Sequence, residues 1–404
     1  MFSNHSESIL SAPHPPQCLT GHNGRHMKRF LLLVFFLAAA GSVSAQDLTV
    51  GVILPFSTAE GAAFEQVLSG MQRNVRLHSS PALGDLTVLE RDDRGSPERA
   101  AELALELLTE QDVHALVCCR DSRTAAAVAE AVAAEHVPVL SLAGAGSLEA
   151  GSTVLALEAD VLGSMRALTS AARQHDGGIS LLTTDDATGE AAEQAFRDGA
   201  LEAGLPVLRV VQFRAGASPL TPEALLAATS QAAVIVVWAD EADTQEAVRA
   251  LAARGWDGPV LVRHEWAASL TTRAGPLQLG TVVPPALLSG TTSAPEANRP
   301  ALTAWRSAAG AVLSGERAGL GSARLYDALS LLLAAHEQAF VYSAGRELNT
   351  GQLRSALYDG LAGAGTIPSA AGTYRLSPRS WSLALPEGLL PATVRGGRFI
   401  PGAP

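Results

Sequence analysis

Short apolar runs alternate with amphipathic segments from residue 48 onward. In the first series, runs rich in valine, isoleucine and leucine predict buried strands at 48–54, 86–90, 115–119 and 137–141. Apolar residues that recur at intervals of three and four predict helices at 60–78, 96–110 and 124–134. In the helix at 96–110, this face consists of Ala100, Leu103, Ala104, Leu107 and Leu108. Strand and helix in repeated alternation predict parallel strands joined by right-handed crossovers.

A second series with the same alternation begins near Thr153. Its predicted strands are 153–157, 179–183, 206–213, 232–238 and 259–263. Its predicted helices are 162–174, 189–203, one that opens at Thr221, and 243–254. After Gly280 the pattern loosens, with helices at 301–313, 322–341 and 350–361. Two such series predict an α/β fold made of two doubly wound parallel-sheet lobes.

The loops that follow the predicted strands are the expected ligand-binding region. In open parallel sheets, ligands bind outside the carboxyl ends of the strands, where loops meet the starts of helices. In the first series these loops are 56–63, 92–93, 120–124 and 143–147, and in the second they are 184–188, 239–243 and 264–265. If the two lobes face each other, the loops form a cleft between them.

Length and charge narrow the range of partners. A chain of 404 residues exceeds the size at which single cores usually stop growing, which favours two domains. The formal charge of −11 and the lack of a Lys/Arg cluster in the body of the chain argue against nucleic acid and anionic membranes as partners. Small molecules and proteins remain.

An export signal precedes the first strand. Met27-Lys28-Arg29 gives a positive start, an apolar run follows at 30–40, and small residues end at Ala45. Residues 27–45 therefore predict a signal peptide cleaved near Ala45 and a periplasmic protein. Residues 1–26 make little sense in front of a complete signal, so we interpret them as a non-native or unstructured extension. The alternative is a signal-anchored protein that begins at Met1.

Two adjacent cysteines, Cys118 and Cys119, end one of the predicted strands. The Cα atoms of neighbouring residues are too close for relaxed disulfide geometry, so we expect two buried, unpaired thiols.

Several of these segments, in this order, resemble a known family. The segments are VGVILPFST, VLERDDRGSPERAAELALELL, VPVLSLAGA, AAVIVVWADEADTQEAVRALAARGWDGPVL and YDALSLLLAA. Together they resemble the leucine/isoleucine/valine-binding proteins, which are type I periplasmic binding proteins that serve ABC importers. The resemblance implies two lobes joined by a hinge of three crossovers, with residues 47–159 and 285–340 in the first lobe and 160–284 and 341–404 in the second.

The resemblance also implies a pocket for an α-amino acid. The family's acidic residue falls on Glu265. The first-lobe helix start falls on Asp121 with Ser122 and Arg123, and the next loop falls on Gly144 and Ala145. The remaining positions, which are aromatic in the family, fall on Ala63 or Phe64, on Thr188 and on Asp240.

Asp121 is a departure from the family, because a carboxylate there would repel the carboxylate of an amino acid. Arg120 or Arg123 could restore carboxylate binding through the fork of the guanidinium, and a ligand richer in donors or positive charge is the other possibility. Asp121 and Ser122 could also simply cap the helix.

The expected function is that of an extracytoplasmic solute-binding protein of an ABC importer, with a membrane permease as partner and an amino acid or related small amine or amide as solute. A ligand-sensing module with the same fold is the alternative. No nucleophile, phosphate-binding loop or dinucleotide fingerprint is visible, so we expect neither an enzyme nor a cofactor. His264 beside Glu265 lacks a third ligand at useful spacing, so we expect no metal site.

Overall fold

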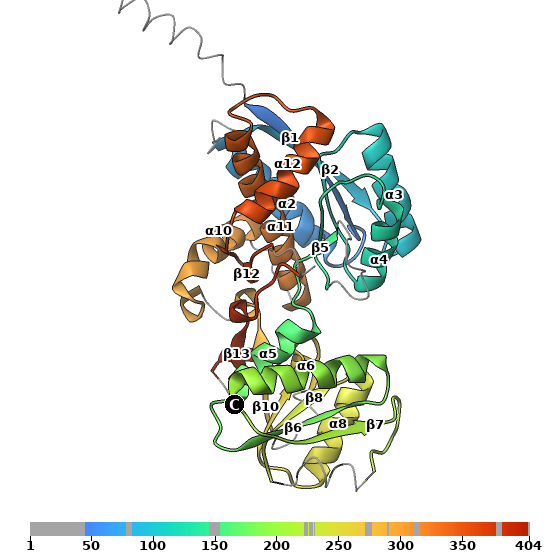
Figure 1. The fold of residues 1–404 in the computed structure, drawn as a ribbon, viewed down its shortest axis with the longest axis vertical. Helices are drawn as coiled ribbons and strands as arrows, with labels where there is room; N and C mark the ends of the chain where they lie inside the picture. Colours follow the sequence, from blue (N-terminus) through green and yellow to red (C-terminus); the bar gives the residue numbers. More distant parts are fainter. Residues whose placement is uncertain are drawn as a thin grey trace, which may run out of the picture. The chain divides into compact units, whose positions relative to one another are not determined.

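The strands of the protein form two main sheets in a computed structural model (Figure 1), which confirms the predicted α/β class. The structure describes residues 45–77, 83–144, 154–221, 225, 229, 231–270, 277–288, 291–310, 316–376 and 382–402. The predicted extension 1–26 and the signal peptide 27–45, except for Ala45, lie outside the described residues, as does most of the helix predicted after Thr221.

The first sheet contains five parallel strands in the order β2-β1-β3-β4-β5. These are β1 (Gln46–Leu54), β2 (Leu83–Asp92), β3 (Ala115–Cys118), β4 (Val139–Ser141) and β5 (Val154–Ala156). The connecting helices are α2 (Gly61–Leu77), α3 (Pro97–Glu110) and α4 (Ser122–Ala131). Val52 and Leu54 of β1 pack in one core cluster with α2, whereas Ile53 packs in another with α3 and α4. Because both faces of β1 are covered, its sequence is a continuous apolar run.

The second sheet contains seven strands in the order β14-β13-β10-β9-β8-β6-β7. These are β6 (Gly178–Thr184), β7 (Val207–Phe213), β8 (Ala232–Trp238), β9 (Pro259–Val262), β10 (Gln278–Val283), β13 (Leu390–Arg395) and β14 (Arg398–Pro401). Its helices are α5 (Val161–Ala172), α6 (Ala187–Ala203), α8 (Glu241–Ala253) and α9 (His264–Leu270). The strands β6 to β10 pair in parallel, while β13 pairs antiparallel with both β10 and β14.

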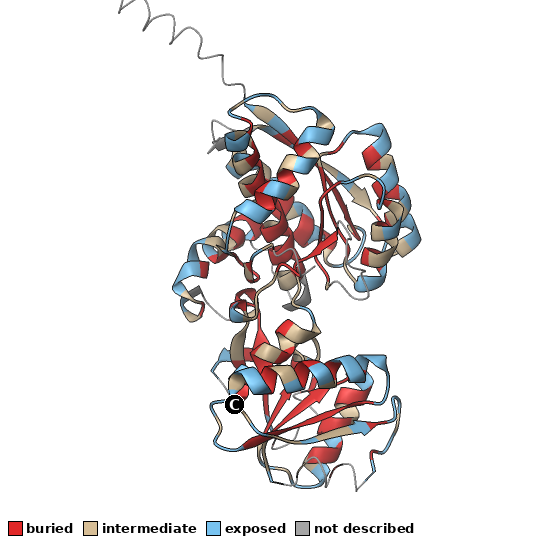
Figure 2. Ribbon diagram, viewed as in Figure 1, coloured by how far each residue is buried: buried red, intermediate tan, exposed pale blue. Residues whose placement is uncertain are grey.

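The helix signals in the sequence identify real helix ends. Ser96 caps α3 by accepting a hydrogen bond from the N–H of Arg99, and the predicted apolar face of α3 is its buried face. Gly204 ends α6 in the left-handed conformation, with φ of 69°. Burial follows the same pattern in Figure 2, where the buried residues concentrate in the strands and on the inner faces of the helices.

The C-terminal helices pack mainly on the first lobe. These are α10 (Arg299–Ala309), α11 (Glu316–Tyr342) and α12 (Thr350–Gly363), and short 3-10 turns lie at Pro285–Leu287, Thr291–Ser293, Glu296–Asn298 and Pro386–Gly388. Leu353, Leu357 and Leu361 of α12 belong to the same core cluster as Val52 of β1. The assignment of all of 341–404 to the second lobe is therefore corrected. Leucines spaced four residues apart commit α12 to the core around α11, and only β13 and β14 join the second sheet.

Within the described residues the chain passes between the two sheets three times. It leaves β5 for α5 near residues 157–160, and it leaves β10 for the first core after Val283. It returns to the second sheet at β13. Just before this crossing, Ser382 forms an isolated β-bridge with Ala156, the last residue of β5. Three crossings are the number implied by the resemblance.

A buried carboxylate on α11 binds the chain segment around residues 370–374, which precedes the last crossing between the sheets. Asp327 of α11 is fully buried and accepts hydrogen bonds from the N–H groups of Ala370 and Ala371 and from the hydroxyl of Tyr374. Tyr374 lies in β12 (Thr373–Tyr374), which pairs with β11 (Ile367–Pro368). Burial, outweighing these hydrogen bonds, raises the pKa of Asp327 to about 7.

The adjacent cysteines form a disulfide, so the expectation of two unpaired thiols is wrong. Cys118 is the last residue of β3, and both cysteines are completely buried. The expectation rested on the short distance between neighbouring Cα atoms, which is 3.7 Å here, but the backbone at Cys119 turns into the left-handed region, with φ of 74°, and the two sulfur atoms meet. The disulfide therefore lies directly before Arg120, one of the candidate binding residues.

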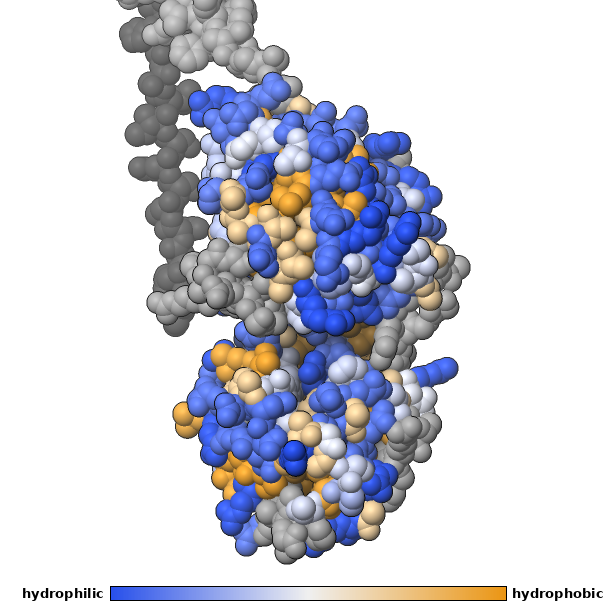
Figure 3. Space-filling model, turned by 90° about the vertical axis from the view of Figure 1, so that its right-hand side faces the viewer, coloured by the Kyte–Doolittle hydropathy of each residue, from blue (hydrophilic) through white to orange (hydrophobic). Residues whose placement is uncertain are grey.

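The surface gives no indication of a membrane-spanning helix. On the face drawn in Figure 3, hydrophilic residues predominate and hydrophobic residues form separate patches. Within the part of the chain that the structure describes, every helix is too short or too polar to cross a bilayer.

Candidate functional site

A cleft of about 800 Å³ lies where the carboxyl ends of strands from both sheets meet. Its lining from the first lobe follows β3, β4 and β5 and includes Arg120, Gly144 and Glu158. Its lining from the second lobe includes Trp238 at the end of β8 and Arg263 directly after β9. A smaller cavity of about 340 Å³ adjoins it and shares Arg120, Glu158, His264, Glu265 and Trp266 with it. The loops selected from the sequence thus lie where a solute could contact both lobes.

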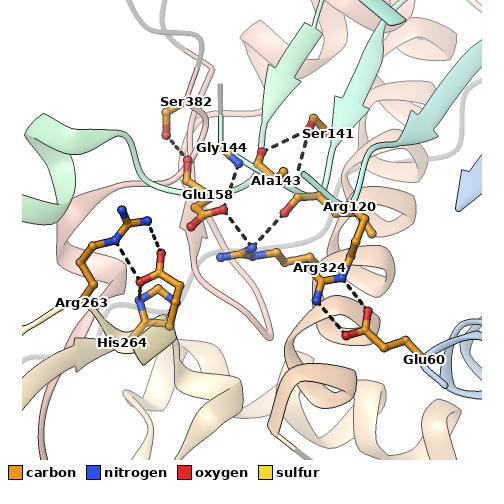
Figure 4. A network of polar contacts seen from close by, with 12 residues as sticks. Glu60, Arg120, Ser141, Ala143, Gly144, Glu158, Arg263, His264, Arg324 and Ser382 are labelled. Carbon is orange, nitrogen blue, oxygen red and sulfur yellow. Dashed lines mark hydrogen bonds and ion pairs between the residues drawn. The ribbon is translucent and has the colours of Figure 1, made fainter. Parts of the chain in front are cut away.

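Arg120 extends into the cleft from the turn after β3 and is held by Glu60, which directly precedes α2. The guanidinium makes a two-pronged pair, with Nε 2.6 Å and Nη2 2.8 Å from the two carboxylate oxygens (Figure 4). This geometry is the strong form of the arginine–carboxylate interaction. It fixes the direction of Arg120 and leaves Nη1 without a hydrogen-bond partner among the described residues.

Arg324 reaches the cavity from the middle of α11 and is only 9% exposed. Its Nη1 donates to the carbonyl of Leu142 at 2.9 Å and to Glu158 Oε2 at 3.3 Å, while the same Glu158 oxygen accepts the N–H of Gly144 at 2.9 Å. Arg324 Nε is buried and has no hydrogen-bond partner among the described residues. Figure 4 shows Arg324 and Arg120 side by side, with Glu158 opposite Arg324.

Arg263 is held in the second lobe by stacking and by charge. Its guanidinium lies 4.8 Å from the ring centre of Trp238 and 5.6 Å from that of Trp266, which are cation–π distances. It donates from Nη2 to Glu265 Oε1 at 2.9 Å and from Nε to Oε2 at 3.4 Å. Burial alone would raise the pKa of Glu265, but His264 and Arg263 outweigh it and hold that pKa well below its usual range. Glu265 is therefore an ionised, already paired carboxylate.

Glu158, His264 and Glu265 each bring one possible metal-ligating atom within 4.8 Å of the others. The sequence does not reveal this group, because Glu158 is far from the His264–Glu265 pair along the chain. Both carboxylates are already paired with arginine, Glu158 with Arg324 and Glu265 with Arg263. Two neighbouring guanidinium groups make this a poor environment for a divalent cation, and we assign no metal here.

Five of the nine predicted site residues line the cleft, namely Asp121, Ser122, Gly144, Thr188 and Glu265. Asp121 is also the N-cap of α4 and accepts the N–H groups of Arg123 and Thr124, so lining and capping coexist in one residue. Because its carboxylate already receives these donors, it is directed toward the helix end.

The structure puts three predicted residues elsewhere, and a fourth, Ala145, lies outside the described residues. Phe64 is completely buried in the core and packs edge-on against Phe56, because the apolar face of α2 points into the first lobe. Arg123 is an exposed residue of the first turn of α4, and Asp240 is an exposed cap of α8. Neither lines the cleft.

Sequence reasoning selected the loop 56–63, which contains Glu60, without naming that residue, and it missed Glu158, Trp238, Arg263 and Arg324. Trp238 and Arg263 are one residue upstream of loops that were selected, so extending each loop back to the strand end would have included them. Glu158 follows β5 and carries the same signal. Arg324 has none, because it lies inside a long helix whose other residues form the core.

Comparisons with known proteins agree with this architecture. Among solved structures, a branched-chain amino acid ABC transporter from Rhodospirillum rubrum matches with a TM-score of 0.63 and 20% identity, over 88% of this chain and 100% of that chain. An ABC transporter substrate-binding protein from Desulfitobacterium hafniense, in complex with Leu, matches with a TM-score of 0.64 and 16% identity, over 88% of this chain and 100% of that chain. A solute-binding protein from R. palustris, in complex with 4-hydroxybenzoate, matches with a TM-score of 0.61 and 16% identity, over 89% of this chain and 96% of that chain.

At the level of sequence, a comparison with curated proteins found no match. The sequence model of one family, described as periplasmic binding protein, matches residues 47–377. That range covers the first sheet and its helices, the strands β6 to β10 of the second sheet, and the first two crossings between the sheets. The chain therefore belongs to the periplasmic binding protein family and has its type I fold.

Proposed function

We propose that this protein is the extracytoplasmic solute-binding component of an ABC importer and that it holds a small polar solute in the cleft. The observation that carries the proposal is the 800 Å³ cleft, which polar side chains from both lobes line at the carboxyl ends of the strands. Its volume is within the range of ligand pockets. The similar structures described as ABC transporter proteins support the assignment to import.

The solute is proposed to be an amino acid or a related small polar molecule that contacts both lobes. Ser122, Gly144 and Thr188 offer hydroxyl and backbone groups, while Arg120 and Glu265 offer charge. A solute that touches both lobes stabilises the closed arrangement by its differential affinity for it. The complexes of similar structures with Leu and with 4-hydroxybenzoate set the size range of the solutes to be tested.

The test is a thermal-shift screen of residues 46–404 against amino acids, amides, amines and small organic acids, followed by calorimetry on every compound that raises the melting temperature. A solute at 100 times its dissociation constant adds about 2.7 kcal/mol to the free energy of unfolding, so binding is readily visible. Recovery of the bound compound unchanged, by mass spectrometry, checks that the protein binds without turnover. A panel that produces no shift contradicts the proposal.

Export and partnership with a permease have tests of their own. The proposed cleavage near Ala45 predicts that the exported protein begins at Gln46, which intact mass measurement of the secreted form checks. Solute-dependent stimulation of a co-reconstituted permease would support import. Solute binding without any permease response would favour the ligand-sensing alternative.

A further inference from the structure

We propose that the solute is a carboxylic acid with an apolar body and no ammonium group, received by Arg324 and Arg120 in the 340 Å³ cavity. This inference rests on the proposed function, and it names the chemical class of solute that the cavity recognises. It differs from an α-amino acid in one group, the ammonium, which would lie beside arginines that already neutralise the carboxylates of the cavity.

The first step is the donor capacity that the arginines retain. A guanidinium carries five N–H donors. Arg324 uses Nη1 on Leu142 and Glu158, but its Nε has no partner although it is buried and the residue is only 9% exposed. Arg120 uses Nε and Nη2 on Glu60. Nη2 of Arg324 and Nη1 of Arg120 have no hydrogen-bond partner among the described residues, so these donors are left for a ligand that supplies acceptors.

The second step is the state of the acidic residues. Glu158 accepts from Arg324 and from the N–H of Gly144, and Glu265 accepts from Arg263. An ammonium group would lie beside these guanidinium groups, whose positive charge opposes it. A carboxylate is attracted by the same charge, and its two oxygens match the geometry of the guanidinium N–H donors that Glu60 and Glu158 leave open.

The third step is the remaining wall of the cavity. Apolar side chains from both lobes complete it, namely Leu142, Leu287, Leu320, Trp266 and Phe399. Apolar walls with a small number of oriented polar groups are typical of sites for compact organic ligands. The combination of two arginines and an apolar wall thus selects an acid with a short aliphatic or aromatic body.

The experiment compares four probes with the same body: 4-methylpentanoate, leucine, 4-methylpentanamide and 3-methylbutylamine. Binding to the protein of residues 46–404 is measured by calorimetry and by the fluorescence of the tryptophans near the cleft. We expect 4-methylpentanoate to bind at least tenfold more tightly than each of the other three. Benzoate, benzamide and benzylamine repeat the comparison with an aromatic body.

Two cavity variants and one control variant locate the site. Arg324→Lys keeps a positive charge but removes Nε and the fork, and it should weaken 4-methylpentanoate binding at least tenfold. Arg120→Gln should do the same. The control is Arg249→Gln on α8, a surface arginine that is also paired with a carboxylate, Glu246, and lies outside the cavity. It should leave the affinity unchanged, and melting temperatures confirm that all three variants are folded.

Tighter binding of leucine or of the amine would overturn this inference and leave the proposed function standing. So would equal loss of affinity in Arg249→Gln and the two cavity variants. Binding of a solute from the wider screen, combined with no binding of any acid, would also overturn it. If no compound of any class binds, the proposed function fails, and the inference fails with it.

Discussion

Replacing His336 by leucine should remove much of the acid sensitivity of the fold. His336 lies in α11 and is 1% exposed. Burial, assisted by the nearby His114, lowers its pKa from 6.5 to about 4, although Asp47 and the backbone at Gln46 act in the opposite direction. The unfolded chain therefore binds a proton here more readily than the folded protein does. This contribution to stability is complete above about pH 6.5 and is lost as the pH falls toward 4.

The pKa values set the magnitude. They differ by about 2.5 units, and one unit corresponds to about 1.4 kcal/mol, so the full effect is about 3.5 kcal/mol, of which about 3 kcal/mol is reached at pH 4 and roughly 2 kcal/mol at pH 5. Asp327 acts with the opposite sign, because its raised pKa of about 7 makes its contribution fall as the pH rises from about 4 to 7. Only the difference between variant and wild type therefore isolates His336.

The assay is urea unfolding of residues 46–404 at pH 7.5 and pH 5, for the wild type, His336→Leu and His336→Gln. The loss of unfolding free energy between the two pH values should be smaller by about 2 kcal/mol in both variants, whatever their stability at pH 7.5. Using one apolar and one polar replacement separates titration from packing. If the wild type and both variants lose the same free energy, His336 does not have the pKa assigned to it.

Three further predictions concern other parts of the molecule. Asp327→Asn removes the titration of this carboxylate, so the fall in the free energy of unfolding between about pH 4 and about pH 7 should be smaller than in the wild type; an equal fall in urea unfolding would contradict the raised pKa of Asp327. Glu265→Gln should leave the affinity for 4-methylpentanoate unchanged or higher, because Glu265 is paired with Arg263, whereas a tenfold loss measured by calorimetry would return Glu265 to a direct role with the solute. Iodoacetamide should label neither Cys118 nor Cys119 in the denatured, unreduced protein and should label both after reduction, and mass spectrometry distinguishes this from free thiols.

The strand ends were the part of the site that could be predicted from sequence. A buried strand is visible as a continuous apolar run, and the residue after it must lie at the ligand-binding edge of a parallel sheet, so Gly144 and Glu265 could be selected. The direction of a side chain around a helix is also predictable where the apolar stripe is narrow, as in α3. Phe64 lies on the apolar face of α2, which correctly assigns it to the core. The family resemblance, which placed Phe64 in the pocket, predicted its position less well.

The partners of the arginines could not be predicted. Glu158 and Arg324 are 166 residues apart, and their pairing depends on how α11 lies across the end of the first sheet. The sequence near Arg324 reads as a core helix, so a single charged residue in it has no local signal. Cys119 is a similar case, since its left-handed backbone is set by its surroundings and not by the residue type.

The partners of the three cleft arginines bear on how the lobes separate. Arg120 pairs with Glu60 and Arg324 with Glu158 on the side of the first sheet, while Arg263 pairs with Glu265 on the side of the second. Among the described residues, no ion pair joins one lobe to the other. Opening the cleft therefore breaks no direct ion pair among the described residues, and what it separates is the charge of Glu158 from that of Arg263, which Glu158 stabilises across the cleft. Under the proposed function, the solute itself is then the bridge between the two halves.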